Sequence, residues 1–251
     1  MKEITNVVMT SDYPGKKVSL TRQRRNEVKM KVAAYVPIKL HNSRMPGKNI
    51  KSLSDGTPLC RLLFRTLGAV SNIDEKYCFC SDEKIIDYLE PGIQFLKRST
   101  RLDQDNVRCD EIIRSFVDMV NPDIIVLTHV TSPFVSIKTI ETCVDKVVSG
   151  KYDSAFTVAR VREFLWENGK PLNFDASCTP RSQDLPEIYR ETNGVFVFTR
   201  DVFEKMNRRV GERPYLCVLD FPEIIDINEP ADFMVADVVH TDRQKQGVSS
   251  C

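Results

Sequence analysis

Hydrophobic and polar positions along the chain alternate between two kinds of pattern. Short apolar runs predict buried strands near 32–38, 77–80 and 123–128. Amphipathic patterns with helical spacing lie near 57–70, 82–89, 107–120 and 136–148. Strands that alternate with helices in this way predict an α/β fold whose sheet is mostly parallel, with helices on both faces.

The pattern becomes less regular after Gly150. It predicts a strand at 154–161, a polar excursion through Arg181, and a further strand at 195–199. A last helix is expected from about 229 to 239, and it should pack back onto the sheet.

Candidate chemistry first appears where the run at 32–38 ends and a polar loop begins. This loop carries Lys39, Arg44 and Lys48, and Pro46 and Gly47 predict a turn just before Lys48. Open α/β sheets bind ligands at the carboxyl ends of their strands, so three cations there indicate a phosphate-binding loop. A solvated surface turn that happens to be basic is the alternative. The loop lacks the upstream glycine of a Walker P-loop.

A second polar loop follows the strand 124–127. It carries His129, Thr131 and Ser132. Parallel strands bring their carboxyl ends to one edge, so this loop and the first should converge on one crevice.

The segments that carry chemistry resemble, in order, those of the cytidylyltransferases that activate sialic acid and related sugar acids. The matching segments are Met45-Pro-Gly-Lys-Asn-Ile50, Cys80-Ser-Asp82, Arg98 through Asp105, His129-Val-Thr-Ser-Pro-Phe134, Pro180-Arg181, Asn193-Gly194 and Ile225-Asp-Ile-Asn228. Together they cover about residues 30–240. The chain departs from the family pattern at several positions. In the first loop Lys39 replaces an arginine, Leu40-His-Asn42 replace small residues and Ser43 replaces a lysine; later, His129 replaces a glutamine and Asn228 an aspartate.

The resemblance implies a Rossmann-like nucleotidyltransferase fold with a small dimerisation arm at about 155–195. It implies an enzyme of class EC 2.7.7 that joins a 2-keto-3-deoxy sugar acid to CTP, giving a CMP-sugar and pyrophosphate, as in polysaccharide biosynthesis. Lys48 would contact the α-phosphate and Lys39 and Arg44 would support it. Asp226 and Asn228 would hold Mg²⁺ or Mn²⁺.

The remaining site residues also follow from the resemblance. The nucleotide site would be bordered by Ser81, Asp82, Arg98 and Asp105. The sugar would be contacted by His129, Thr131, Ser132, Arg181 and Asn193, with Arg181 pairing with the sugar carboxylate. A homodimer is implied, because in related synthetases the arm helps to close the partner's pocket.

Several of these residues have a structural interpretation beside the functional one. His129 would then be a core histidine, Asp226 an exposed loop acid, and Asn228 the cap of the helix that follows. The aromatic residues Phe164, Trp166 and Tyr189 would form either a dimer interface or a local core.

Composition agrees with one globular domain in the cytoplasm. The chain has 251 residues, 41% of them hydrophobic, and a formal net charge of +1, so nucleic acid is not an expected partner. No apolar stretch approaches the roughly 20 residues that span a bilayer. The eight cysteines are scattered, and we expect mostly buried free thiols without zinc-finger spacing.

Both ends of the chain are expected to lie outside the domain. Residues 1–29 lack sustained periodicity and are predicted to be disordered or a non-native extension, with Met30 as a hypothetical alternative start. Residues 241–251 are predicted to be a flexible tail.

Two other functions stay open at this stage. A degenerate protein of the same fold would bind a nucleotide or sugar without catalysis, which the altered first loop and Asn228 would explain. The chain could also be another nucleotidyltransferase or a glycosyltransferase, although Thr128-His-Val130 is not the Asp-X-Asp motif that a metal-dependent glycosyltransferase needs.

Overall fold

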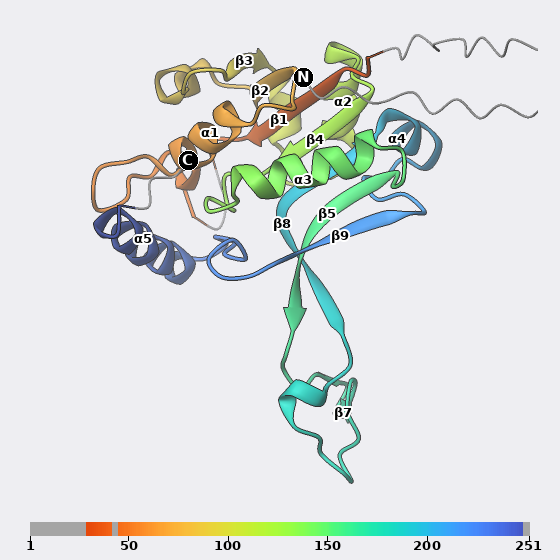
Figure 1. The fold of residues 1–251 in the computed structure, drawn as a ribbon. Helices are drawn as coiled ribbons and strands as arrows, with labels where there is room; N and C mark the ends of the chain where they lie inside the picture. The colour runs from red at the N-terminus through yellow and green to blue at the C-terminus, as the bar shows by residue number, and fades with distance from the viewer. Residues whose placement is uncertain (1–28, 42–44, 248–251) are drawn as a thin grey trace, which may run out of the picture.

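A computed structural model describes residues 29–41 and 45–247 of the chain. Its main sheet has seven strands in the order β3-β2-β1-β4-β8-β5-β9 (Figure 1). The strands are β1 (Val32–Ile38), β2 (Glu75–Cys80), β3 (Gln94–Lys97), β4 (Ile124–Thr128), β5 (Ser154–Val161), β8 (Ile188–Thr199) and β9 (Pro214–Leu219). Only β8 runs antiparallel to its neighbours in this sheet. The predicted mostly parallel α/β sheet is confirmed.

Helices cover both faces of this sheet. They are α1 (Leu59–Ala69), α2 (Cys109–Val120), α3 (Ile137–Val148), α4 (Arg200–Met206) and α5 (Pro230–Lys245). The core cluster on one face takes in α1 and α3, and the cluster on the other face takes in α2 and Phe203 of α4. Strand β1 is buried on both faces, and its alternate residues join the two clusters, which explains its apolar sequence without polar alternation.

The sequence prediction matched β1 and β5 at both ends and, among the elements given above, missed β3, β9 and α4. The segment predicted as a helix at 82–89 is a 3-10 helix, η2 (Glu83–Tyr88). Three further short turns are η1 (Lys48–Ile50), η3 (Thr100–Asp103) and η4 (Ser182–Asp184).

The last helix is longer than predicted. It continues to Lys245, so the predicted flexible tail is helical in its first part. Its Phe233 and Ala236 join the core cluster on the α1 and α3 face of the sheet. It is also held by the loop before α1, where Asp55 accepts hydrogen bonds from His240 at 2.9 Å and from Gln244 at 2.7 Å. The helix lies at the edge of the fold (Figure 1).

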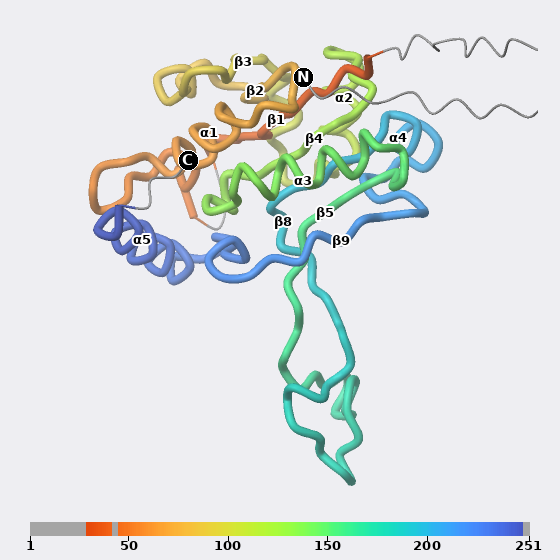
Figure 2. The backbone as a smooth tube through the Cα atoms, in the orientation of Figure 1, coloured from red at the N-terminus to blue at the C-terminus, as the bar shows by residue number. Residues whose placement is uncertain are grey.

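An arm projects from the sheet where β5 and β8 continue past their neighbours (Figure 2). It carries η4 and a two-stranded ribbon of β6 (Trp166–Glu167) and β7 (Lys170–Pro171). Phe174 packs edge-on against Phe164 and Trp166, with ring centroids 4.9 and 5.4 Å apart. Trp166 is nevertheless 59% exposed, so this small cluster does not bury it. An interface at these aromatics stays a prediction.

No helix in the described part of the chain is long and apolar enough to cross a membrane. Seven cysteines lie in the described ranges, and all are free thiols, most of them buried. The predicted disordered segment 1–29 lies outside the described residues except for Lys29.

The stacking of Phe116 on Tyr35 joins α2 to the central strand β1. Their ring centroids are 4.2 Å apart and both side chains are fully buried. Because truncation would leave a large cavity, Phe116→Ala should lower the free energy of unfolding by about 3–5 kcal/mol in chemical denaturation. Met119→Ala on the exposed side of the same helix should change it by less than about 0.5 kcal/mol. Equal effects of the two substitutions would contradict this packing.

Candidate functional site

Four parallel strands end at one edge of the sheet, and each is followed by a predicted site residue. Lys39 follows β1, Ser81 follows β2, Arg98 follows β3 and His129 is the first residue after β4. Strand β1 pairs with β2 on one side and with β4 on the other, so the strand order reverses between β1 and β4. Ligands of open α/β sheets bind at such a reversal.

A cavity of about 320 Å³ opens at this reversal. Its lining includes Lys39, Lys48, Arg98, Asp105, His129 and Thr131. The structure therefore brings together six of the residues that the sequence predicted, from four separate segments of the chain.

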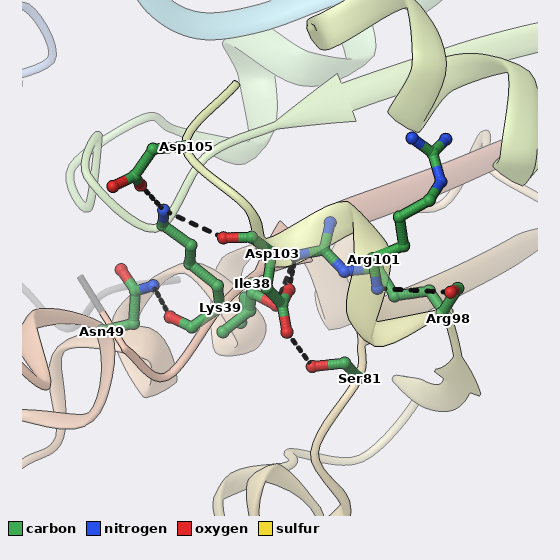
Figure 3. A network of polar contacts seen from close by, with 9 residues as sticks. Ile38, Lys39, Asn49, Ser81, Arg98, Arg101, Asp103 and Asp105 are labelled. Atoms are coloured by element: carbon green, nitrogen blue, oxygen red, sulfur yellow. Dashed lines mark hydrogen bonds and ion pairs between the residues drawn. The ribbon is translucent and has the colours of Figure 1, made fainter. Parts of the chain in front are cut away.

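The buried guanidinium of Arg98 organises the polar side of the cavity (Figure 3). Its Nη2 donates to the carbonyl oxygen of Ile38 at 3.1 Å and to Asp103 Oδ1 at 2.7 Å. Ser81 donates its hydroxyl proton to the other oxygen of Asp103. Asp103 was not predicted, because nothing in the sequence distinguishes it from its acidic neighbours.

Arg98 still has donors to offer. Its Nε and Nη1 are buried and have no hydrogen-bond partner among the described residues. Leaving buried donors unsatisfied costs about 1–3 kcal/mol, more for a charged group. An anionic ligand in the adjacent cavity would supply the missing acceptors, so this arginine fits a nucleotide site.

Lys39 also lies in an ion pair that a ligand can replace. Its ammonium donates to Asp105 Oδ1 at 2.7 Å, and its carbonyl oxygen accepts from the side chain of Asn49 at 2.9 Å (Figure 3). The Asp105 side chain is 74% exposed, so this pair contributes little stability. Phosphate oxygens can therefore take the place of Asp105 at low cost.

Lys48 joins three loops at the edge of the cavity. The turn before it is made by Gly47 with φ of 67°, a left-handed conformation that favours glycine. The Lys48 ammonium donates to the carbonyl oxygen of Ile227 at 2.6 Å, and the Ile227 N–H donates to the carbonyl of Thr131 at 2.8 Å. Arg44, the third predicted cation of this loop, lies outside the described residues.

Asp226 lies next to this junction, and its carboxylate accepts hydrogen bonds from two side-chain amides. Its Oδ2 accepts from the side chains of Asn193 at 3.2 Å and Asn228 at 2.9 Å. Its Oδ1 is buried without a hydrogen-bond partner in the described ranges.

These residues fit a weakly bound Mg²⁺. The free Oδ1 of Asp226 is a hard oxygen ligand, and a turn of the Asn228 amide would add a second oxygen. Among the described residues no group of three His, Cys, Asp or Glu side chains could hold a metal. Mg²⁺ commonly uses one or two carboxylates and completes its shell with water and substrate phosphates, so one carboxylate is sufficient here. Asn228 does not cap α5 with its side chain, because Glu229 takes that position.

His129 lines the cavity and contacts Asn193 behind it. Its Nδ1 lies 2.9 Å from the carbonyl oxygen of Asn193, and the imidazole is partly exposed to the cavity. Burial lowers the pKa of His129 below its ordinary value of 6.5, and the charge of Arg209 lowers it further, against the opposing effect of the Asn193 bond. The imidazole is therefore neutral at pH 7.

Comparison with known proteins agrees with this geometry. The sequence model of the family described as cytidylyltransferase matches residues 33–221. The chain belongs to this family. N-acylneuraminate cytidylyltransferase A of Danio rerio is 27% identical over 241 residues, 91% of this chain and 54% of that protein. The 3-deoxy-manno-octulosonate cytidylyltransferase 2 of Hydrogenovibrio crunogenus is 24% identical over 71% of this chain and 78% of that protein. The chain spans about half the length of its N-acylneuraminate relatives.

Solved structures of nucleotidyltransferases share the fold. CMP:2-keto-3-deoxy-manno-octonic acid synthetase complexed with CTP superposes with a TM-score of 0.64 and 13% identity, over 85% of this chain and 99% of that one. The 4-diphosphocytidyl-2C-methyl-D-erythritol synthase of Anaerococcus prevotii gives 0.59 and 12%, over 84% and 96%. The predicted Rossmann-like nucleotidyltransferase fold is confirmed.

Three residues that the family resemblance assigned to the site do not line this cavity. Arg181 is on the arm, exposed and paired with Asp184 at 2.7 Å, so it does not face the cavity of its own chain. Ser132 is fully buried, and its hydroxyl donates to the carbonyl of Thr192 at 3.3 Å. Asp82 caps η2 by accepting from the Lys84 N–H at 3.0 Å. Ser132 and Asp82 thus have structural roles here.

A proton NMR titration tests the surroundings of His129. Because the folded protein favours the neutral ring, the His129 resonance should move with a midpoint below 6.5 as the pH falls. His129→Gln assigns the resonance by removing it. A midpoint at or above 6.5 would contradict the burial of this ring and its proximity to Arg209.

Proposed function

We propose that this member of the family transfers CMP from CTP to a 2-keto-3-deoxy sugar acid and releases pyrophosphate. The observation that carries the proposal is the cavity at the β1/β4 reversal, where the buried Arg98 has unsatisfied donors and two lysines lie beside it. Such a site suits a triphosphate. Membership of the cytidylyltransferase family supports CTP as the nucleotide.

The reaction forms one bond to phosphorus and breaks another, and the proton of the attacking hydroxyl is released to water. The anomeric hydroxyl of the sugar attacks the α-phosphorus of CTP, and the bond from that phosphorus to the β-phosphate oxygen breaks, so that pyrophosphate leaves. Charge develops on the α-phosphoryl and leaving-group oxygens. Lys48 and Lys39 would stabilise that charge in the transition state more than in the ground state, which is the condition for faster chemistry.

A divalent cation, Mg²⁺ or Mn²⁺, would add to this effect. When bound, it would neutralise phosphate charge as the pyrophosphate departs. Asp226 would hold it through the free Oδ1, and Asn228 would contribute an amide oxygen.

The sugar acid would lie on the side of the cavity formed by His129 and Thr131, beside Asn193. Its carboxylate needs a cation, and Arg181 would reach it only from the arm of a second copy of the chain. We therefore propose a homodimer in which each arm completes the partner's site. The projection of the arm away from the main sheet supports this arrangement (Figure 2).

A second function is favoured by one observation. With Asn228 in place of a second carboxylate, the described site holds one negative ligand for a metal. A protein that binds CTP and a sugar acid without catalysing their reaction would tolerate this loss. Pyrophosphate release separates the two functions.

The first experiment measures pyrophosphate release with CTP, Mg²⁺ and a panel of 2-keto-3-deoxy sugar acids. Lys48→Met and Asp226→Asn should each reduce kcat by about 100-fold or more, because each removes charge stabilisation at the reacting phosphate. The matched controls Lys51→Met and Asp220→Asn change exposed residues of the same charge and should retain activity. CTP binding without release in the unaltered protein would favour the non-catalytic function.

The metal site yields its own prediction. Asn228→Asp adds a second carboxylate beside Asp226, so Mg²⁺ should bind more tightly, with half-saturation at a concentration lower by about tenfold. Titration of Mn²⁺ followed by electron paramagnetic resonance measures this without turnover. Unchanged or weaker binding would show that Asn228 does not face the ion.

A further inference from the structure

The loop after α4 places Arg209 against Phe196 of β8 and Cys109 of α2, and two near sequence neighbours of Cys109, Val107 and Ile112, line the cavity. Asn207 ends α4 in a left-handed conformation with φ of 50°, and its side chain donates to Asp110 at the start of α2 at 2.9 Å. These contacts attach the end of α4 to α2. The direction of the loop through Arg209 is therefore set by two helices.

Arg209 has an aromatic and an acidic partner on β8. Its guanidinium lies 3.7 Å from the centroid of the Phe196 ring, a stacking distance that fixes the plane of the charged group. Its Nη2 donates to Glu191 Oε2 at 3.3 Å. The Arg209 side chain is 27% exposed and that of Glu191 is 48% exposed, so both are accessible to a ligand.

This pair does not line the cavity itself, but it is linked through β8 to residues on the proposed sugar side. Glu191 precedes Asn193 by two positions, a span of about 7 Å in extended chain. Asn193 contacts both His129 and Asp226. The charge of Arg209 also contributes to the lowered pKa of His129, after burial, which places it within electrostatic reach of that ring.

We propose that Arg209 and Glu191 bind the hydroxyl and amide substituents of the sugar acid, at the end away from its reacting hydroxyl, and so determine which sugar acid is used. The inference rests on the function proposed above. Glu191 supplies an acceptor and Arg209 a donor, which together match groups that both donate and accept. The pair has no net charge and Glu191 would repel a second carboxylate, so it does not suit the carboxylate of the sugar.

The Arg209–Glu191 pair would distinguish an N-acylneuraminate from a 3-deoxy-manno-octulosonate, the two sugar acids named in the relatives. An N-acylneuraminate carries an acylamido group and a longer hydroxylated chain than an octulosonate, which has neither the amide nor the ninth carbon. A site built to hydrogen-bond such groups leaves its polar atoms unpaired when the substrate lacks them. The pair should therefore favour the longer, acylamido-bearing acid.

The test compares steady-state kinetics of the unaltered protein and Arg209→Met, with Mg²⁺, CTP and each of the two sugar acids. Methionine keeps apolar contact with Phe196 but cannot donate. The KM for N-acetylneuraminate should rise about tenfold or more, while the KM for CTP and the kcat change less than about threefold. The preference over the octulosonate should shrink accordingly. Arg208→Met, which removes an exposed arginine paired with Glu212, is the matched control and should leave both KM values unchanged.

Failure of this inference differs from failure of the proposed function. If the unaltered protein turns over sugar acids and Arg209→Met leaves their KM values unchanged, the inference is wrong and the function stands. If the unaltered protein releases no pyrophosphate, saturation-transfer NMR of N-acetylneuraminate decides. If the saturation-transfer signal of the sugar is lost in Arg209→Met, the proposed role of Arg209 and Glu191 is supported. If the signal is equal in the two proteins, that role is wrong. If the unaltered protein gives no signal, both proposals are wrong.

A second variant guards against misfolding of the first. Glu191→Gln removes the charged acceptor from an exposed position on β8 and keeps its shape. It should also raise the KM for N-acetylneuraminate, with the KM for CTP and the melting temperature unchanged. A fall in melting temperature without a change in KM would assign the pair a purely structural role.

Discussion

The site depends on the contacts at Ile227, whose carbonyl accepts from the Lys48 ammonium and whose N–H donates to Thr131. The three segments involved are far apart in the sequence, and the last of them comes after the whole sheet has been built. Lys48 is 7% exposed, so its bond forms where water competes poorly and where an ammonium needs a partner. The position of Asp226 follows from this junction, because Asp226 is the neighbour of the residue that is held.

Two cations at the cavity are each paired with a carboxylate, and the two ion pairs differ in how easily a ligand can replace the carboxylate. The buried Arg98 is held by Asp103, whereas Lys39 is held by an exposed Asp105. Separating the first pair costs much free energy, because it would leave a buried charge without a partner. Separating the second pair costs little, because Asp105 is exposed to solvent. The protein can therefore keep one cation fixed at the bottom of the cavity while another exchanges its carboxylate for a phosphate. This combination of fixed and exchangeable positive charge suits the proposed binding of a triphosphate.

Sequence reasoning predicted the framework well where apolar periodicity was strong. Strands β1 and β5 were located at both ends. For β1 the reason is that a strand covered on both faces has no polar alternation to blur its limits. Strand β9 was missed since exposed Leu216 and Val218 alternate with buried positions in a short edge strand. The last helix was predicted to pack on the sheet, and Phe233 and Ala236 do join the core cluster there, but nothing in its sequence shows that His240 also reaches Asp55.

Among the site residues, too, those that belong to a local sequence pattern could be predicted, and those defined by contacts with distant segments could not. Lys39, Lys48, His129 and Thr131 follow strands or turns that the sequence reveals, whereas Arg98 follows the missed strand β3 and was assigned by the family resemblance. All five line one cavity. Asp103 and Arg209 gain their meaning from partners on other segments, Ser81 and Glu191, so no local pattern could identify them. Ser132 matched a motif but is turned inward to bond Thr192, because a motif preserves a loop's shape as well as its ligand contacts.

Hydrogen exchange with and without CTP and Mg²⁺ tests most directly whether the cavity between β1 and β4 is the nucleotide site. The account predicts that CTP slows amide exchange in the segments that contain Lys39, Lys48, Arg98 and Ile227, whereas the arm around Arg181 is unchanged in the absence of a sugar acid. Protection confined to the arm or to α5, or no protection at the carboxyl edge of the sheet despite CTP binding, would contradict it.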